Sequence, residues 1–485
     1  MMIFIIRHTL LAALMVNFLP CVFAQDKDID REDLYIQSKD RFDKKEQYRP
    51  LSLREAIDQG LRKNYGQQER QLQGTLLDIQ WDDVRDGFWL PNVTLSLISA
   101  EHRVARLRDG GKSGSSFSKR PSGALALELG DYTLFNWGKD YLSYLNDKTT
   151  IMRSKDNLKE QKRDLKHQII IKYFEVNFYQ NFITFRREYL RHASFIYRLA
   201  REKVSIKKIS REEYYQARSL YLAAQSAYQE ALNLKANADE ALSLLVNETA
   251  GIRFILKDDL DYIKLKSSFD EILSFSEEKN TSVRDASAAV ENAQRSHELT
   301  LKENLPLPKF TLNLGAYTHS FGRNQSQTNY QTAPGSSDLE VVATLNATWS
   351  ITGPGGLFNG RKNQAAAINK YLAFNQLAEA KHQARSQANT YFANIKYFED
   401  QMTVLDARNS NLEKTFDQIL ESYLNRKVNF WDFRHALEEK IQTEIFTAQV
   451  KYEHLKNKVL LAQNMGMDDY PGENFERLAK VRKEE

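Results

Sequence analysis

The chain contains the same strand-opening motif twice. Around Pro91 it reads Leu-Pro-Asn-Val-Thr-Leu-Ser-Leu, and around Pro308 it reads Leu-Pro-Lys-Phe-Thr-Leu-Asn-Leu. Each copy follows a polar helical stretch and precedes a second alternating segment and a longer helix, and the copies lie nearly half the chain apart. An internal repeat constrains a fold more strongly than any other sequence signal. The sequence therefore predicts a duplicated helix–strand–strand–helix unit.

Residues 1–24 have the features of a secretory signal peptide. Arg7 supplies a positive charge, a short apolar run extends from Thr9 to Leu19, and small residues end the segment at Ala24. A membrane anchor is the alternative, but the apolar run is too short to span a bilayer comfortably. Cys21 suggests a lipoprotein, although the proline before it fits a lipobox poorly. We expect cleavage after Ala24, which leaves a mature chain without cysteine.

Charged residues make up 27% of the 485 residues, and the formal net charge is only +4. A nucleic-acid-binding protein would concentrate its basic residues in a stripe. The composition instead favours long solvated helices. Beyond the signal peptide no apolar run reaches the length of about 18 residues that a transmembrane helix needs. Strands of a membrane barrel give a much weaker hydropathy signal and remain compatible with this chain.

Four segments alternate apolar and polar residues with a period of two, as half-buried strands do. They cover about 91–105, 121–135, 309–322 and 338–352. A soluble sandwich is one interpretation, but four strands are few for a sandwich and no helix remains to cover them. A membrane barrel is the other, because aromatic residues lie near the strand ends, where aromatic girdles belong. On this interpretation the lipid-facing residues include Leu95, Leu127, Leu312, Leu345 and Trp349.

Four strands cannot close a barrel alone, since single-chain membrane barrels have at least about 8. Unpaired strand edges are not tolerated in lipid, because their backbone groups would lack hydrogen bonds. Further copies of the chain must therefore complete the barrel. Three copies would supply about twelve strands, although two copies would also close a small barrel.

Two very long helices follow the strand pairs. Neither 139–204 nor 361–424 contains proline or glycine, and at about 1.5 Å per residue each would extend roughly 100 Å. Each is expected to turn back near 205–211 or 424–430, so that helical hairpins cover 139–247 and 361–466. A seven-residue spacing in the second long helix predicts a coiled-coil seam formed by Leu377, Ala384, Tyr391, Phe398, Leu405, Leu412 and Ile419. In the return helix of the first hairpin the predicted seam is Tyr214, Ala217, Tyr221, Ala224, Tyr228, Ala231, Ala238, Leu242 and Leu245.

The repeats divide the chain into units that alternate with charged segments. The first repeat opens with a helix, in which Ser52 and Glu55 have the spacing of a capping box and which is expected to run to about Asp86. The predicted order is signal peptide, charged lead, first repeat, inter-repeat linker, second repeat and charged tail, at 1–24, 25–50, 51–250, 251–268, 269–466 and 467–485.

The sequence gives no support for catalysis. The nine histidines are scattered and form no zinc-binding motif. Gly110-Gly111-Lys112-Ser113 resembles the end of a phosphate-binding loop, but Arg106 stands where the first glycine should be and no strand–loop–helix context surrounds it. We therefore expect no enzyme activity, no metal and no cofactor.

Duplicated units, a signal peptide and alternating strands beside very long helices resemble the TolC-type outer-membrane efflux and secretion channels. The resemblance covers about 51–466, and its most specific pieces are the two strand openings and the Leu-Phe-Asn triplets at 134–136 and 357–359. It implies a mainly α fold with β, in which three protomers share one twelve-stranded β-barrel and one periplasmic α-helical barrel. It also implies an outer-membrane location and a tip that docks on a periplasmic adaptor coupled to an inner-membrane pump.

The resemblance also implies roles at the two hairpin turns. Glu213 matches an acid and Tyr423 a tyrosine that together hold the closed end shut, while Val428 replaces a neighbouring arginine. Asp432 matches one of two acids that ring the entrance, and His435 occupies the other position. Cations stand at and beside the places of the turn glycines and would form a basic adaptor-docking tip: Lys207, Lys208, Arg426 and Lys427. Ordinary solvated carboxylates remain the alternative for the two acids.

Two functions are compatible with these features. The first is a homotrimeric outer-membrane exit duct for efflux of small molecules or for type I secretion. It would work with a periplasmic adaptor and an energised inner-membrane pump or ABC transporter. The second is a periplasmic coiled-coil scaffold without a conducting pore. A duct would fractionate with the outer membrane, whereas a scaffold would be released by osmotic shock.

Overall fold

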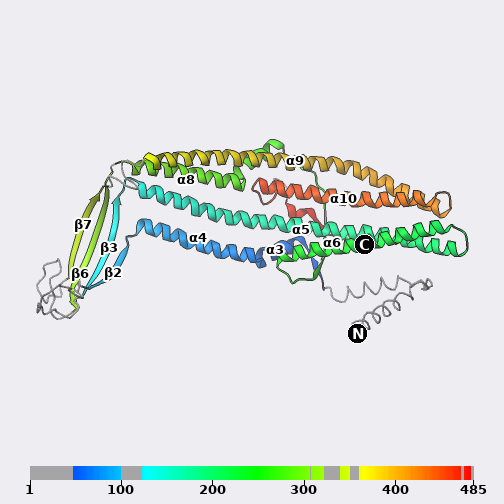
Figure 1. Cartoon of the computed structure of the whole chain (residues 1–485), viewed down its shortest axis with the longest axis horizontal. Coiled ribbons are helices and arrows are strands. Elements are labelled where there is room, and N and C mark those ends of the chain that lie inside the picture. Colours follow the sequence, from blue (N-terminus) through cyan, green and yellow to red (C-terminus); the bar gives the residue numbers. More distant parts are fainter. Residues whose placement is uncertain are drawn as a thin grey trace, which may run out of the picture.

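The computed structural model describes residues 47–99, 123–305, 307–321, 339–349, 360–470 and 474–481. These residues form an elongated rod, with a four-stranded sheet at one end and the turns of two helical hairpins at the other (Figure 1). The signal peptide, most of the charged lead, the loops predicted near 103–120 and 323–338, and the second Leu-Phe-Asn triplet lie outside the described residues.

Two helical hairpins make up most of the rod. Helix α5 (Lys139–Ser205) turns back into α6 (Arg211–Val246), and α9 (Gly360–Leu424) turns back into α10 (Phe430–Asn464). Both long helices lie where the absence of proline and glycine predicted them, and both turns lie within the expected segments 205–211 and 424–430. The structure is thus mainly helical with few strands, as the sequence predicted.

Shorter helices lead from the middle of the rod toward the sheet (Figure 1). Helix α3 (Leu53–Lys63) is followed by α4 (Tyr65–Trp89), and α7 (Phe269–Lys279) is followed by α8 (Thr281–Glu303). The predicted capping box at Ser52 is present. The prediction of a single helix from Ser52 to about Asp86 was wrong, because the chain forms two helices here and the second continues to Trp89.

An asparagine lies at each of these breaks. The side chain of Asn64 accepts a hydrogen bond from the backbone N–H of Gln67, at the start of α4. The side chain of Asn280 accepts from the backbone N–H groups of Ser282 and Val283, at the start of α8. Each asparagine therefore replaces helical hydrogen bonds by a new N-terminal cap, which interrupts the helix without a proline.

The four-stranded sheet is antiparallel and has the order β2-β3-β6-β7. Its register places Leu95 opposite Leu127 and Leu312 opposite Leu345, so that the predicted apolar positions share one face of the sheet. Strands β2 and β7 are the two edges. The strand bounds lie close to the predicted segments, at Val93–Ser99, Gly123–Phe135, Lys309–Phe321 and Leu339–Thr348.

The helical hairpins bury small and apolar residues at their seams. In α6 most of the predicted seam is buried, at Ala217, Ala224, Tyr228, Ala231, Ala238 and Leu242, whereas Tyr214, Tyr221 and Leu245 are partly buried. In α9 the predicted stripe is only partly buried, with Ala384 and Leu405 in the core. A second stripe is more buried and comprises Ala388, Ile395, Met402, Phe416 and Tyr423, which follow at intervals of seven except where the polar Asn409 takes the place between Met402 and Phe416. Because α9 packs against both α8 and α10, it needs two apolar stripes.

Segments far apart in the sequence meet near the middle of the rod. Strand β1 (Gln47–Leu51) pairs in parallel with β4 (Ile252–Leu256), and β5 (Asp258–Leu260) pairs antiparallel with β8 (Ala479–Val481), next to the 3-10 helix Phe475–Leu478. The segments expected as charged lead and tail therefore each contribute a strand, and the expected linker contributes two, none of which was predicted from the sequence.

These small sheets cover the largest apolar core among the residues that the structure describes. It includes Tyr173 and Phe174 of α5, both fully buried. The Tyr173 hydroxyl donates to a carboxylate oxygen of Asp258 at 3.0 Å, which fixes the linker on the helix. Gly466 follows α10 with φ +66°, and a Cβ there would lie 2.2 Å from the carbonyl oxygen of Lys279. Only glycine permits this close approach of the two backbones.

Candidate functional site at the helical tip

Two turns close the helical hairpins at the end of the rod remote from the sheet (Figure 1). In the first, the backbone N–H of Lys207 donates to the carbonyl three residues earlier at 3.0 Å, and that of Lys208 donates to the carbonyl five residues earlier at 2.8 Å. The second turn repeats both bonds at Arg426 and Lys427, with the same lengths. This pattern is the Schellman ending of a helix, which requires one residue in the left-handed conformation.

The left-handed residues of the two turns are Lys207, with φ 58°, and Arg426, with φ 60°. These are the positions where the family resemblance implied glycine. A residue with a Cβ pays a steric penalty of roughly 1–2 kcal/mol in this conformation. The tip therefore carries backbone strain at two places, and both strained residues are exposed cations.

Relief of this strain gives a first prediction. We expect Lys207→Gly to stabilise the tip by about 1 kcal/mol, because glycine adopts positive φ without a steric penalty. Amide hydrogen exchange of the α5–α6 turn should slow accordingly. Lys208→Gly is the matched control, since Lys208 does not have positive φ. Equal effects of the two changes would contradict the assignment of strain to Lys207.

The structure brings Glu213 and Tyr423 together. The Tyr423 hydroxyl donates to a carboxylate oxygen of Glu213 at 3.3 Å, which links the end of α9 to the start of α6. Tyr423 is only 8% exposed and stacks on Phe433, with ring centroids 5.1 Å apart. Burial, followed by the negative charge of Glu213, raises the pKa of the Tyr423 hydroxyl. The neutral tyrosine thus remains a hydrogen-bond donor well above neutral pH.

Asp432 and His435 occupy different surroundings from this pair. Both are exposed on the first turns of α10. The backbone N–H of Asp432 donates to the N-cap side chain of Asn429 at 2.9 Å. The His435 imidazole lies 3.9 Å from a carboxylate oxygen of Glu439, one turn farther along the helix. Neither residue contacts Glu213 or Tyr423 among the interactions described here, so the candidate site consists of a hydrogen-bonded pair, in which Tyr423 is buried and Glu213 half-buried, and an exposed rim.

Sequence analysis missed a second connection between the hairpins. Glu188 of α5 forms an ion pair with Lys440 of α10 at 2.8 Å and lies 3.6 Å from His192. It is about 25 Å along α5 from the turn, at 1.5 Å per residue. A hydrogen bond with His192, and then the charge of Lys440, lowers the pKa of the Glu188 carboxyl to about 2 against the opposing effect of burial.

This lowered pKa predicts how stability depends on pH. A carboxyl whose pKa is depressed by folding stabilises the folded state above its unfolded pKa, here about 4.5, and loses that contribution as pH falls toward 2. We expect Glu188→Gln to lower the free energy of unfolding at neutral pH, with a difference that disappears near pH 2. Denaturant unfolding over a pH series measures it. Exposed Glu421 is the control, and a Glu421→Gln variant with the same pH-dependent loss would contradict the role of this ion pair.

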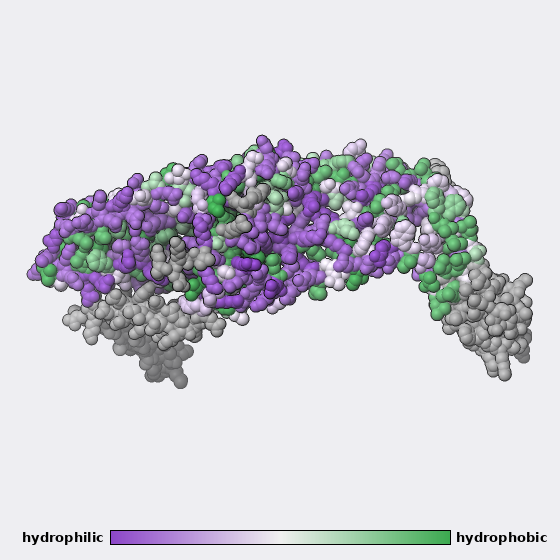
Figure 2. All heavy atoms as spheres, turned by 180° about the vertical axis from the view of Figure 1, so that it is seen from behind, coloured by the Kyte–Doolittle hydropathy of each residue, from purple (hydrophilic) through white to green (hydrophobic). Residues whose placement is uncertain are grey.

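The opposite end of the molecule exposes a broad apolar surface. Leu95, Leu127 and Leu345 are 68%, 48% and 66% exposed, and Trp349 beside β7 is 55% exposed. Leu312, at the paired position opposite Leu345, is partly buried. Figure 2 shows hydrophobic residues gathered over the strands, whereas the helical rod is mainly hydrophilic on the face in view. An uncovered apolar sheet face of this kind indicates contact with lipid or with another protein.

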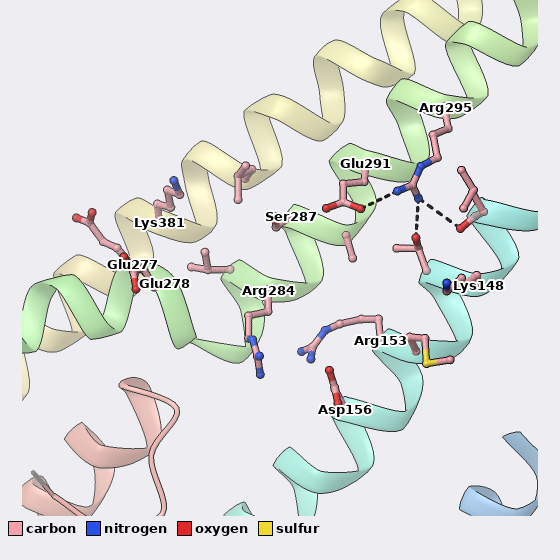
Figure 3. Close-up of a pocket in the computed structure, with 16 residues that line it drawn as sticks. Lys148, Arg153, Asp156, Glu277, Glu278, Arg284, Ser287, Glu291, Arg295 and Lys381 are labelled. Carbon is pink, nitrogen blue, oxygen red and sulfur yellow. Dashed lines mark hydrogen bonds and ion pairs between the residues drawn. The ribbon is translucent and has the colours of Figure 1, made fainter. Parts of the chain in front are cut away.

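A groove of about 730 Å³ lies between α5, α8 and α9, on the sheet side of the central core. Its walls are charged, and Figure 3 shows Arg295 reaching from α8 to Glu291 on its own helix and to groups on α5. Beside it, the carboxylate of Glu160 accepts hydrogen bonds from Arg153 at 2.6 Å and from Arg284 at 2.8 Å. Arg153 and Glu160 both lie on α5, so it is the bond from Arg284 that joins α8 to α5 by a polar contact, where the central core joins helices by apolar ones.

Neither a membrane-spanning helix nor a metal-binding cluster is found in the part of the chain that the structure describes. No helix there combines the length and apolar character needed to cross a bilayer. No group of three or more histidine, cysteine, aspartate or glutamate side chains there is arranged to hold a metal ion.

Comparison with known proteins supports the fold. No protein-family model matches the chain, and no curated protein matches it in sequence. Among solved structures, the outer-membrane protein VceC of Vibrio cholerae has a TM-score of 0.70 at 13% identity, over 86% of this chain and 96% of that chain. The CmeC outer-membrane channel of Campylobacter jejuni has a TM-score of 0.69 at 16% identity, over 88% of each chain.

The same architecture recurs in a channel described as open. The MtrE outer-membrane channel of Neisseria gonorrhoeae has a TM-score of 0.67 at 16% identity, over 86% of this chain and 89% of that chain. At such low identity these likenesses speak for the fold. The resemblance inferred from the strand openings and the long helices is thereby confirmed: the chain has the fold of the TolC-type outer-membrane efflux channels.

Proposed function

We propose that this protein is the outer-membrane exit duct of an efflux or type I secretion system, acting as a homotrimer. Its four strands would supply one third of a twelve-stranded barrel, and its helical hairpins would supply one third of a periplasmic tunnel. A periplasmic adaptor and an energised inner-membrane pump or ABC transporter would complete the pathway. The shared fold with channels such as CmeC and MtrE supports this role.

The exposed apolar face of the four-stranded sheet carries the proposal. Exposure of its leucine side chains to water would be unfavourable, whereas burial of these side chains in lipid would be favourable. Strands β2 and β7 are edges in a single chain. In lipid these edges need partners for their backbone hydrogen bonds, and other copies of the same sheet can provide them. In three copies joined edge to edge, every β2 and β7 strand would have a partner for its backbone hydrogen bonds.

The tip would carry both the closed constriction and the docking surface. The hydrogen bond from Tyr423 to Glu213 ties one hairpin of a protomer to the other, so that its rupture would allow the hairpins to separate. Exposed Asp432, repeated three times around the entrance, would favour cations, as carboxylate rings do in channels.

Cell fractionation separates this function from the scaffold alternative. We expect the full chain to fractionate with the outer membrane, to require detergent for extraction and to have three times the protomer mass in mild detergent. The apolar sheet face gives the physical reason, since it must be covered by lipid or detergent. Release of the protein by osmotic shock, as a soluble species, would instead favour a periplasmic coiled-coil scaffold.

A further inference from the structure

The two tip turns carry positively charged side chains and no negatively charged ones. Residues 205–210 and 425–429 include four cations and no acid. The four are Lys207, Lys208, Arg426 and Lys427, all of them exposed, and none forms an ion pair with another described residue. Acidic residues lie outside these two segments, as Glu213 and Asp432 do near the starts of α6 and α10. The outermost surface of the rod is therefore positive.

Helix capping explains only part of this pattern. A cation near the C-terminus of a helix is favoured by the helix dipole, and any position in the last turn would satisfy that preference. The left-handed position is the least favourable place for a long side chain, because glycine fits it without strain. Nevertheless both turns have a cation there, Lys207 in one and Arg426 in the other. Two separate turns thus accept a steric penalty and keep a positive charge.

We propose that the tip recognises an acidic protein surface, with these four cations binding carboxylates of the partner that docks there. This inference rests on the proposed function, in which the tip is the docking end, and it adds the chemistry of the partner. Lys207 and Arg426 are exposed and form no ion pair with a described residue, which leaves their donors available for an incoming chain. A lysine presents three donors and an arginine five, and carboxylates are their natural acceptors in proteins.

Binding of a simple acidic probe tests the inference on the full chain in detergent. The probe is poly-L-glutamate, with poly-L-lysine as the reverse-charge control. In the tip variant, glutamine replaces the four cations, which removes charge and keeps side chains in the left-handed positions: Lys207→Gln, Lys208→Gln, Arg426→Gln and Lys427→Gln. A matched variant removes four exposed cations elsewhere: Lys148→Gln, Lys264→Gln, Lys266→Gln and Lys381→Gln.

We expect the tip variant to bind poly-L-glutamate on the order of tenfold more weakly than the native chain, because several exposed ion pairs are lost. The matched variant should bind like the native chain, and high salt should abolish the difference. Equal loss in both variants would overturn the inference, as would tip-dependent binding to anionic lipid vesicles without binding to poly-L-glutamate.

Conductance in planar bilayers separates this inference from the proposed function. If the tip variant conducts like the native chain but has lost the acidic probe, both proposals are supported. If the tip variant conducts like the native chain and also binds poly-L-glutamate as tightly, the inference of an acidic partner is wrong and the proposed function stands. If the native chain forms no channel at all, the proposed function fails whatever the probe shows.

Discussion

Replacing Leu345 by arginine is expected to abolish assembly of the protein into the outer membrane. The side chain is 66% exposed on the apolar face and lies opposite Leu312 in the register. A cation on the lipid face near the middle of the bilayer costs about 2–4 kcal/mol in each protomer. A trimer would place the change at three points of one barrel. The yield of membrane-inserted protein, measured by fractionation, should fall to background.

The neighbouring residue provides the matched control. Asn346 is also exposed but points to the opposite face, because successive side chains alternate along a strand. In the proposed barrel this face lines the lumen, where a charge mainly alters ion selectivity. Asn346→Arg should therefore insert normally. Equal membrane yields of the two variants would show that the lipid-facing side has been assigned wrongly or that the sheet does not enter lipid.

Removing the hydrogen bond between Tyr423 and Glu213 is expected to raise single-channel conductance in planar bilayers. A hydrogen bond to a charged group contributes about 1.5–3 kcal/mol, so its loss shifts a closed-to-open equilibrium roughly tenfold to a hundredfold. The double variant Tyr423→Phe with Glu213→Gln removes the donor and the charge and changes little volume. The ion pair of Glu188 with Lys440 still joins the hairpins in this variant, so the tunnel wall should remain folded.

Asp432→Asn is the contrasting variant. Asp432 is exposed and makes no contact with Glu213 or Tyr423 among the described interactions, so the closed state should persist. Its expected effect is a weaker preference for cations, because the proposed ring would lose its charge. If the double variant conducts like the native protein, Glu213 and Tyr423 do not gate the channel. If Asp432→Asn leaves selectivity unchanged, its carboxylate is an ordinary solvated group.

Local patterns account for what the sequence predicted correctly. The four strands follow from alternation with a period of two, and the long helices from the absence of proline and glycine. The α6 seam follows from intervals of three and four. The pairing of Glu213 with Tyr423 came from the family resemblance, since no local pattern links residues that far apart. Lys207 and Arg426 were placed in the same way, and their left-handed conformations agree with that placement.

Contacts between distant segments account for what the sequence did not predict. Strand β1 pairs with β4 across about two hundred residues, and each strand has only five residues, too few for its pattern to be recognised alone. The ion pair between Glu188 and Lys440 spans a similar separation, and charged residues are common on both helices. The break at Asn64 depends on a side-chain cap that competes with a helix of otherwise ordinary composition.

Planar-bilayer recording of the purified full chain tests whether copies of this chain form a conducting pore. We expect discrete conductance steps from protein extracted with mild detergent, cation-selective and larger in the variant lacking the bond between Tyr423 and Glu213. Protein that has the mass of the trimer and gives no steps, either in its native form or in that variant, would contradict the proposed function.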